Sequence, residues 1–543
     1  MKKLQYNCII VFLVMLLSAC DTFGQTTPPS CVITAPHSNA YYKQGTDVEI
    51  RVYASTAGGS FQGGDIDRVE FLSDTVLLGE TTMATSNSYS FVWDSVPEGT
   101  YRITARAYDS NGNISTSAGV IVKAASAEVS KRGMSACKGK YVGNIIAGSV
   151  RSDFTTYWNA VTSENAMKWG VLEQYRNTMN WTSADLAYNH AKNNNIPFRY
   201  HVIAWGSQYP SWISSLQPAE FQAEMEQLMS LVSQRYPLID QVEVLNEAMY
   251  INTWNGKEHA AGTPLFRAGL GGPGATGYDW AIWLFEKARQ YFPDSKLVLN
   301  DFEMETNQAG VQELLNMIKV LRDRNLIDGF GTQAHTFNVD NTPANTIQSA
   351  LNLMATSGLP IYVTELDLKG TANPVTEASQ LASYQKAFPV YWNHPAVAGI
   401  SLWGYVQGTM WQPDAFLLMS NGTERTALTW LKSYLADRPN IGYPCCPAVS
   451  TVNTGPEIPF PDRQISIYPN PLSTGKVFVH FEQAVYSDVS ITVYNQIGQM
   501  LFRQTHEPSV QYEIDLAGND HGLYLLHIST DDWFTVKRVV MVR

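Results

Sequence analysis

The stretches VEVLNEAMY (Val242–Tyr250) and IYVTELDLK (Ile361–Lys369) decide the fold of this chain. Each reads as a short apolar strand that ends in a glutamate, Glu247 in the first and Glu365 in the second. An α/β barrel presents its catalytic groups in this way, on buried parallel strands that release polar side chains at their C-terminal ends. The two stretches therefore predict a barrel with two carboxylates at one end.

The same pattern continues through residues 136–440, where apolar β-like runs alternate with amphipathic helical patterns. The runs include PFRYHVIAW, KLVLNDF and AVAGISLWG, and FQAEMEQLMSLVSQRY is one of the helical patterns. Regular alternation of strand and helix over roughly 300 residues is typical of a (β/α)8 TIM barrel. This region also holds 12 of the 14 Trp residues, which fits either a large core or a surface that stacks on sugar rings.

Two all-β segments flank the predicted barrel. Residues 30–124 show alternating apolar and polar side chains between turn clusters such as GGSFQGGD, which predicts a small sandwich. Residues 465–543 show the same alternation, and residues 441–464, with five prolines, read as a linker. The predicted fold class is therefore α/β, a TIM barrel between two small all-β sandwich domains.

The N-terminal residues 1–24 read as a targeting segment. Two lysines precede an apolar run, Cys8–Leu17, that is too short to span a bilayer as a mature helix. Two cleavage patterns remain open. The tetrapeptide LSAC resembles a lipobox that would leave Cys20 acylated, whereas the following TFG suits ordinary signal peptidase, which we favour.

Export makes disulfides an expected feature of the mature chain. Four cysteines remain beyond the targeting segment, Cys31, Cys137, Cys445 and Cys446, and four cysteines allow three pairings. Cys137 precedes the predicted barrel and the last two follow it. Because the two ends of a domain often lie close together, we predict that Cys137 pairs with Cys445 or Cys446.

Composition restricts the partners of the chain. A net charge of −12 argues against nucleic acid and against an anionic membrane surface, and it is compatible with a neutral polysaccharide. No Cys/His cluster has metal-ligand spacing, and no glycine-rich strand–turn–helix pattern suggests a nucleotide. We therefore predict no metal and no cofactor, and we expect a monomer.

Seven motifs lie in order along the predicted barrel. They are TSENAMKW (Thr162–Trp169), HVIAWGSQYPSW (His201–Trp212), VEVLNEA, LNDFE (Leu299–Glu303), GTQAH (Gly331–His335), VTELDL and SLWGYVQGTMW (Ser401–Trp411). Together they resemble glycoside hydrolase family 10, chiefly secreted endo-β-1,4-xylanases. The resemblance implies hydrolysis of internal xylan bonds with retained anomeric configuration, with Glu247 as general acid/base and Glu365 as nucleophile.

The resemblance also implies a set of substrate-binding residues. Within it, the amide of Asn246 would bind the sugar 2-hydroxyl and His335 would orient the nucleophile. Glu164, Asn165 and Lys168 have a spacing suited to one face of a helical turn, and Gln333 is expected to share one face of a strand with His335. The full set is Glu164, Asn165, Lys168, His201, Trp205, Gln208, Asn246, Phe302, Gln333, His335, Trp403 and Trp411.

Several positions depart from the pattern of the family. Gly206 stands where members usually have His, Val242-Glu243 where they have Trp-Asp, and Phe302 where they have Tyr. A glycine-rich insertion, Ala260–Asp279, is expected to shape the aglycone side of the cleft. The departures keep two alternatives open, namely the same chemistry on substituted xylan or another β-glucan, and a non-catalytic surface glycan-binding protein.

The flanking segments carry resemblances of their own. The strings VEFLSD, YSFVWDSVPEGTY and RAYDSNGN resemble bacterial Ig-like domains, which would serve as a spacer or bind sugar directly. The strings YPNP, NQIGQ, GLYLLHI and VKRVV resemble the C-terminal sorting domain of type IX secretion. That resemblance implies the type IX machinery as a partner and a secreted or surface-attached protein, with an outer-membrane lipoprotein as the alternative.

Overall fold

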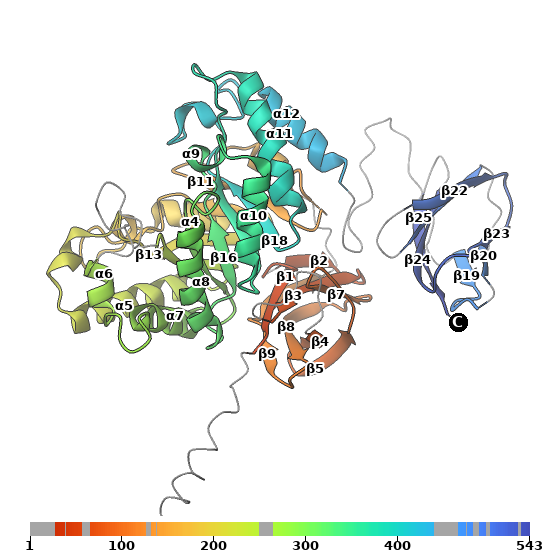
Figure 1. Cartoon of the computed structure of the whole chain (residues 1–543), viewed down its shortest axis with the longest axis horizontal. Coiled ribbons are helices and arrows are strands. Elements are labelled where there is room, and N and C mark those ends of the chain that lie inside the picture. The colour runs from red at the N-terminus through yellow and green to blue at the C-terminus, as the bar shows by residue number, and fades with distance from the viewer. Residues whose placement is uncertain are drawn as a thin grey trace, which may run out of the picture. The chain divides into compact units, whose positions relative to one another are not determined.

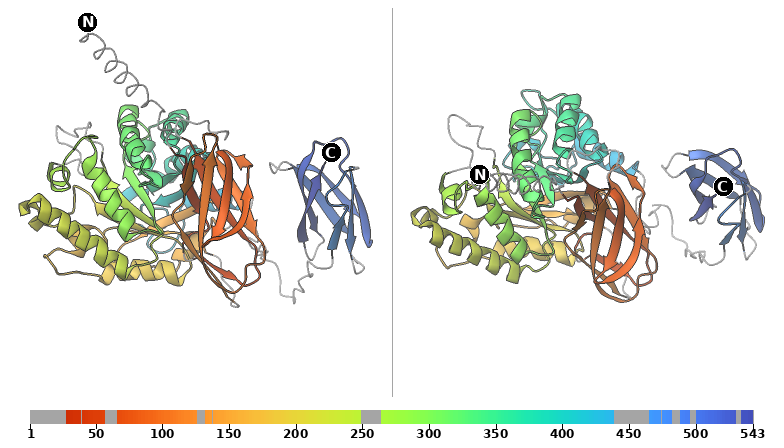
Figure 2. Two further views of the ribbon diagram at one scale, coloured as in Figure 1. Left: turned by 90° about the horizontal axis from the view of Figure 1, so that it is seen from below. Right: turned by 60° about the horizontal axis from the view of Figure 1, so that its bottom comes forward.

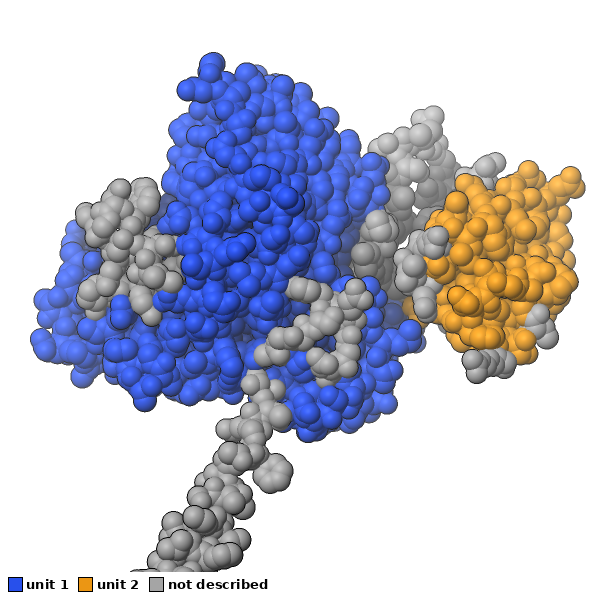
Figure 3. All heavy atoms as spheres, viewed as in Figure 1, with its two compact units in different colours: residues 1–447 blue, residues 448–543 orange. Residues whose placement is uncertain are grey.

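The chain forms two compact units, Met1–Pro447 and Ala448–Arg543, which Figure 3 colours separately. The computed structural model describes residues 28–38, 40–56, 66–125, 132–136, 138–248, 264–438, 465–473, 475–481, 488–495, 500–529 and 534–542.

The predicted targeting segment and linker lie outside the described residues, as do Cys137, Cys445 and Cys446. The disulfide between barrel ends therefore stays a prediction. Cys31 is described, and it is a buried free thiol whose Sγ lies 3.5 Å from the carbonyl oxygen of Ala105. In the described part of the chain, no helix is both long enough and apolar enough to cross a membrane.

A closed barrel of eight parallel strands forms the centre of the first unit (Figure 1). The last strand pairs with the first, which confirms the predicted barrel. In order around the barrel, the strands are β11 (Tyr141–Ile146), β12 (Val161–Ser163), β13 (Phe198–Ala204), β14 (Gln241–Asn246), β15 (Lys296–Asp301), β16 (Gly329–Thr332), β17 (Ile361–Leu366) and β18 (Val397–Leu402).

Helices connect the strands and cover the outside of the barrel (Figures 1 and 2). In α8, for example, Val311, Leu314, Ile318 and Leu321 recur at helical spacing and are buried, so one stripe of the helix packs on the sheet. The described helices are α2 (Phe154–Tyr157), α3 (Trp169–Leu172), α4 (Thr182–Asn193), α5 (Pro218–Arg235), α6 (Pro264–Gly269), α7 (Asp279–Tyr291), α8 (Gln308–Arg322), α9 (Thr336–Val339), α10 (Ala344–Ala355), α11 (Glu377–Asn393) and α12 (Thr426–Ala436).

The barrel strands are buried on both faces, which is why they read as nearly continuous apolar runs. Every residue of β13, β14 and β17 is buried. Charged side chains still occur inside these strands, among them Arg199, Glu243 and Glu365. A buried charge is unfavourable unless it is paired, so these residues point to a site within the barrel.

The N-terminal domain of the same unit is a sandwich of two sheets, as predicted. One sheet has the order β1-β3-β7-β6 and the other β2-β10-β8-β4-β5, with β9 paired to β8. The strands are β1 (Ser30–Ala35), β2 (Ala40–Lys43), β3 (Val48–Ser55), β4 (Ile66–Ser73), β5 (Val76–Thr81), β6 (Ala84–Thr85), β7 (Ser88–Trp93), β8 (Gly99–Asp109), β9 (Ile114–Thr116) and β10 (Val120–Ala125).

The second unit is also built of two sheets, ordered β19-β20-β23 and β22-β21-β24-β25. Its core combines side chains from both sheets, including Val477, Val493 and Leu526. The all-β prediction for the tail is therefore confirmed. The strands are β19 (Ile465–Tyr468), β20 (Lys476–Phe481), β21 (Val489–Asn495), β22 (Met500–His506), β23 (Gln511–Asp515), β24 (Gly522–Ser529) and β25 (Phe534–Met541).

Candidate active site

The predicted site residues gather at one end of the barrel. Apart from His201 at the centre of β13, each lies near the end of a barrel strand or in the loop that follows it, from Glu164 after β12 to Trp411 after β18. Since the strands are parallel, their C-terminal ends meet on one face of the barrel. The structure thus brings together residues that are up to 247 positions apart, 411 − 164, in the sequence.

Glu365, near the end of β17, has a buried carboxylate with two close partners. Its side chain accepts a hydrogen bond from Asn300 Nδ2 at 3.0 Å on Oε1, and His335 Nε2 lies 3.4 Å from Oε2. Burial alone would raise the pKa of Glu365, but the hydrogen bond from His335 and nearby positive charge outweigh it and lower the pKa to about 2. The carboxylate is therefore ionised at neutral pH, as a nucleophile must be.

His335 links this carboxylate to a second one. Its Nδ1 lies 2.9 Å from Asp367 Oδ2, and Asp367 also accepts hydrogen bonds from Thr336 N at 2.7 Å and Trp411 Nε1 at 2.9 Å. Burial opposes the charged imidazole, but Asp367 and Glu365 on its two sides raise the pKa of His335 to about 10. The result is an imidazolium fixed between two carboxylates.

Glu247 follows β14 directly and is only partly buried. Its carboxylate accepts hydrogen bonds from Trp205 Nε1 at 2.7 Å and from Gln333 Nε2 at 3.0 Å. The backbone of Glu247 has a φ of +59°, a conformation that is unfavourable for a residue with a side chain and that concentrates at functional sites. Because Glu247 is only partly buried, its carboxyl group can exchange a proton with substrate or water.

Amide side chains connect the two glutamates. Asn246 Oδ1 accepts a hydrogen bond from Asn300 Nδ2 and another from Gln333 Nε2, each at 3.2 Å. Asn300 also donates to Glu365, and Gln333 also donates to Glu247. A single chain of hydrogen bonds therefore runs from one carboxylate to the other and restrains the position of both.

A further group of polar side chains, here called the Lys168 group, consists of Lys168, Asn165, Gln208 and Glu164 beside Trp205. The ammonium donates to Asn165 Oδ1 at 2.8 Å and to Gln208 Oε1 at 2.6 Å, and it lies 4.7 Å from the ring centre of Trp205. Burial lowers the pKa of Lys168 and raises the pKa of Glu164, the other charged residue of this group. Such a cluster of rigid donors and acceptors beside an aromatic ring is suited to binding sugar hydroxyls.

Aromatic side chains enclose the site on two sides. Trp403 is buried and packs edge-on against His201, with ring centres 5.2 Å apart. Trp411 is 50% exposed and Phe337 is 52% exposed. The ring centres of Phe337 and Phe302 lie 6.4 Å apart. Exposed aromatic faces at the mouth of a polar site are typical of surfaces that stack on sugar rings.

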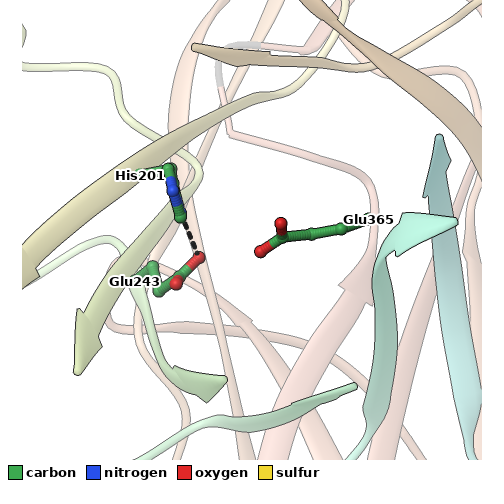
Figure 4. Close-up of side chains that lie close together, drawn as sticks. All are labelled: His201, Glu243 and Glu365. Carbon is green, nitrogen blue, oxygen red and sulfur yellow. Dashed lines mark hydrogen bonds and ion pairs between the residues drawn. The ribbon is translucent and has the colours of Figure 1, made fainter. Parts of the chain in front are cut away.

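A buried charge network lies beside Glu365 (Figure 4). Of its members, only His201 was expected in the site from the sequence, whereas Arg199, Glu243 and Asn300 were not. Glu243 accepts from the guanidinium of Arg199, its Oε2 lies 3.0 Å from His201 Nδ1, and its Oε1 accepts from Asn300 Nδ2 at 3.3 Å. Figure 4 shows His201 and Glu243 on one side of Glu365. Asn300 donates to both carboxylates, so the network helps to fix the nucleophile.

Three of these residues have the spacing of a metal site. Ligand atoms of His201, Glu243 and Glu365 all lie within 4.8 Å of one another, close enough to hold a cation. However, the guanidinium of Arg199 already contacts Glu243 and would repel a second cation there. The set therefore fits an ion-pair network better than a metal centre, and the predicted absence of a metal stays a prediction.

Two residues of the site that sequence analysis missed carried a readable signal, and others did not. Asp367 follows Glu365 by two positions, and Arg199 precedes His201 by two, so strand alternation could have placed each pair on one face. Glu243 lies where the pairing of β14 with β15 shifts register, and such an irregularity re-aims side chains in a way that sequence alone does not reveal.

Two local predictions are wrong in detail. The residues from Asn165 to Lys168 form a turn, closed by a backbone hydrogen bond of 3.1 Å between them, rather than a helical turn. Gln333 and His335 lie beyond the end of β16, with the backbone of Ala334 between them at a φ of +58°, rather than on one face of a strand. Lys168 nevertheless donates to Asn165 Oδ1 at 2.8 Å, and His335 Nε2 lies 3.4 Å from Glu365 Oε2, as expected of a residue that orients the nucleophile.

The described part of the glycine-rich insertion begins at Pro264. Phe266 of α6 packs edge-on against Tyr209 and Phe221, with ring centres 5.7 and 5.4 Å apart. Tyr209 directly follows Gln208, so this helix packs beside the loop that carries part of the Lys168 group. The role of residues 260–279 on the aglycone side stays a prediction.

Replacing Asp367 by Asn tests how the charge on Glu365 is controlled. Without the Asp367 carboxylate the pKa of buried His335 falls, Glu365 loses a cationic neighbour, and the pKa of Glu365 rises by roughly 1–3 units. As the pH is lowered, Glu365 then becomes protonated at a higher pH than in the wild type, and a protonated Glu365 cannot act as the nucleophile. We therefore expect the acidic limb of kcat/KM to move to higher pH, measured on an aryl xyloside, the type of substrate that the family resemblance implies.

The control for this experiment is Asp323→Asn, because Asp323 pairs with Lys319 at 2.7 Å on the outer helix α8. We expect that control to keep the wild-type pH profile. An Asp367→Asn profile that is lower throughout, with an unmoved acidic limb, would contradict the coupling of Asp367 to Glu365.

Comparison with known proteins assigns each part of the chain. Residues 122–434 match the model of glycosyl hydrolase family 10, residues 29–105 match a bacterial Ig domain, and residues 466–542 match a secretion system C-terminal sorting domain.

Among curated proteins, the endo-1,4-beta-xylanase B of Cellvibrio japonicus is 39% identical over 294 residues, which cover 54% of this chain and 45% of that protein. The endo-1,4-beta-xylanase A of Phanerodontia chrysosporium is 28% identical over 271 residues, covering 49% and 63%. The chain thus spans less than two thirds of either relative. Among solved structures, native xylanase 10B from Thermotoga maritima has 24% identity and a TM-score of 0.49, and the match covers 57% of this chain and 98% of that one.

Proposed function

The chain belongs to glycosyl hydrolase family 10, and from this premise we propose that it is a secreted endo-1,4-β-xylanase that retains anomeric configuration. The observation that carries the proposal is the pairing of a buried, ionised Glu365 with a partly exposed Glu247 at one end of a closed barrel. Retaining glycosidases need two carboxyl groups roughly 5 Å apart, one ionised and one able to give up a proton.

In the first step of the proposed reaction, Glu365 attacks the anomeric carbon while protonated Glu247 gives its proton to the departing sugar oxygen. The glycosidic bond breaks and an ester bond to Glu365 forms. The ester removes the negative charge of Glu365. The fixed His335 imidazolium, 3.4 Å away, then faces a neutral group and favours the return of the carboxylate.

In the second step, ionised Glu247 takes a proton from water, and the resulting hydroxide attacks the anomeric carbon from the side that the leaving group vacated. The bond to Glu365 breaks, and Glu247 is again protonated. The partial exposure of Glu247 suits this exchange with water, whereas the buried Glu365 suits a covalent ester that is protected from other nucleophiles.

Two neutral donors hold the Glu247 side chain in place. Trp205 and Gln333 each donate a hydrogen bond to one of its two oxygens, so the carboxyl group keeps its orientation in both protonation states. The Lys168 group and the exposed ring of Trp411 would bind the sugars beyond the cleavage point.

Substituted xylan is the second candidate substrate, with other β-glucans behind it. Gly206 follows Trp205 at a position where members of the family usually have a histidine, and α6 packs beside the same loop. Reducing-sugar release should be compared on unsubstituted xylan, arabinoxylan, glucuronoxylan and mixed-linkage glucan. We expect the xylans to exceed the glucan by at least tenfold, and a preference for the glucan would reject the xylanase assignment.

For the rest of the chain, we propose that residues 466–542 direct export by the type IX secretion machinery, which leaves the enzyme outside the cell or on its surface. The supporting observation is the match to a C-terminal sorting domain, together with the separate folding unit that these residues form. Acylation of Cys20 and the monomeric state remain predictions.

A further inference from the structure

The Ig-like sandwich lies beside the barrel (Figures 1 and 2), and its contacts place it at the end opposite to the two glutamates. The barrel residues that contact it come from loops that enter strands, and such loops lie at the N-terminal face of a barrel. These residues are Gly139 before β11, Asn195 before β13, Asp240 before β14, Asp294 before β15 and Gly358 before β17.

Directional polar contacts fix the sandwich in one orientation. The side-chain amide of Asn195 accepts from Tyr41 N at 2.8 Å and donates to Tyr41 O at 3.1 Å, so it pairs with the backbone of β2. Strand β2 is the edge of its sheet, and an unpaired edge is a liability that proteins usually cover. A carboxamide on the barrel therefore does what a neighbouring strand would do.

Charged side chains add two more attachment points. Arg102 donates through Nε and Nη2 to Asp294 Oδ1 at 2.9 and 2.6 Å, and Arg51 Nη1 donates to Gly139 O at 3.0 Å. The hydroxyl of Ser30 donates to the carbonyl of Gly358. The ion pair is partly exposed, since the Arg102 side chain is 42% exposed. It therefore contributes little free energy and serves mainly to orient the sandwich on the barrel.

The contact also has an apolar centre. Tyr53 of β3 is 3% exposed, and it belongs to the apolar cluster of the barrel rather than to that of its own sandwich. Burial of a large aromatic side chain against a neighbouring domain contributes hydrophobic free energy to the contact. Removal of the sandwich would expose both this ring and the barrel surface beneath it.

We propose that the Ig-like domain is docked in a fixed orientation on the N-terminal face of the barrel. There it stabilises the catalytic fold and takes no part in binding polysaccharide. A spacer would touch its neighbour only through a linker, whereas this domain contacts five loops of the barrel. A domain that feeds a polymer into the cleft would lie near the carboxyl ends of the strands, and this one lies at the other end. The inference does not depend on which glycan the enzyme cleaves.

Calorimetry of the full-length chain tests the proposal. Apart from a transition of residues 448–543, we expect the sandwich and the barrel to unfold together in a single transition. The double variant Arg102→Ala/Asn195→Ala should lower that transition by about 2–4 °C or more, or split it in two. The matched control is Arg68→Ala, because Arg68 pairs with Glu70 at 3.1 Å within the sandwich. We expect this control to shift the transition by no more than about 1 °C.

Three results would overturn the proposal. One is a wild-type chain whose sandwich and barrel unfold in separate transitions. Another is a double variant that unfolds at the wild-type temperature. The third is reduced retention of the double variant on insoluble xylan at a temperature at which it is fully folded, which would show that this face binds polysaccharide. The calorimetric readout needs no substrate, so it stays decisive even if the xylanase assignment fails.

Discussion

Replacing Glu365 by Gln is expected to abolish turnover of xylan, with a fall in kcat of at least ~10⁴-fold. The amide has nearly the same shape, so it keeps the contact with Asn300, but it cannot form the ester bond on which the reaction depends. It also leaves the His335 imidazolium facing a neutral group. The measurement is reducing-sugar release under saturating xylan, with circular dichroism to show that the variant is folded.

A matched control separates loss of chemistry from loss of a buried charge. Glu224 on the outer helix α5 is also buried, and it pairs with Arg176 at 2.5–2.8 Å rather than with any residue of the site. We expect Glu224→Gln to keep kcat within a few-fold of the wild type. Retention of wild-type activity by Glu365→Gln would reject the assignment of Glu365 as the nucleophile.

Glu247→Ala carries the second large effect, and its size should depend on the leaving group. On xylan, where the departing oxygen needs a proton, we expect kcat/KM to fall by roughly 10²–10⁴-fold. On an aryl xyloside with an acidic phenol, formation of the intermediate needs little protonation and should be nearly unaffected. Pre-steady-state release of the phenol measures that step, and the slow turnover that follows reflects the missing general base.

Added azide should distinguish this role from a purely structural one. As an anion that needs no deprotonation, azide can enter the space vacated by the Glu247 side chain and attack the intermediate, so it should restore phenol release and give a glycosyl azide. The wild-type enzyme should show no such gain. Equal losses on xylan and on the activated substrate, without rescue, would indicate that Glu247 holds the site together rather than transferring protons.

Much of this architecture is readable from sequence because the barrel depends on local patterns. Apolar strands that end in polar residues, repeated with helical segments between them, are enough to place Glu247 and Glu365 at one end of a barrel. The members of the site that lie next to a predicted residue, such as Asp367, could also have been found, because a strand exposes every second residue on one face.

The connections between strands were not predictable in this way. Asn300 bridges two glutamates from two other strands, and its role depends on the register of β14, which contains an irregularity. Phe337 follows a turn whose backbone departs from the strand, so its exposure at the cleft has no periodic signal. The position of the Ig-like domain rests on contacts such as that between Tyr41 and Asn195, 154 residues apart, and no local pattern encodes them.

The account depends most on a covalent bond between Glu365 and the sugar. A 2-deoxy-2-fluoro xylobioside with a good leaving group should trap that bond, since the fluorine slows the second step more than the first. Mass spectrometry of the digested enzyme should then find one fluoroxylobiosyl group on the peptide that contains Glu365. A label on any other residue, or an active enzyme that takes up no label and inverts the anomeric configuration, would contradict the account.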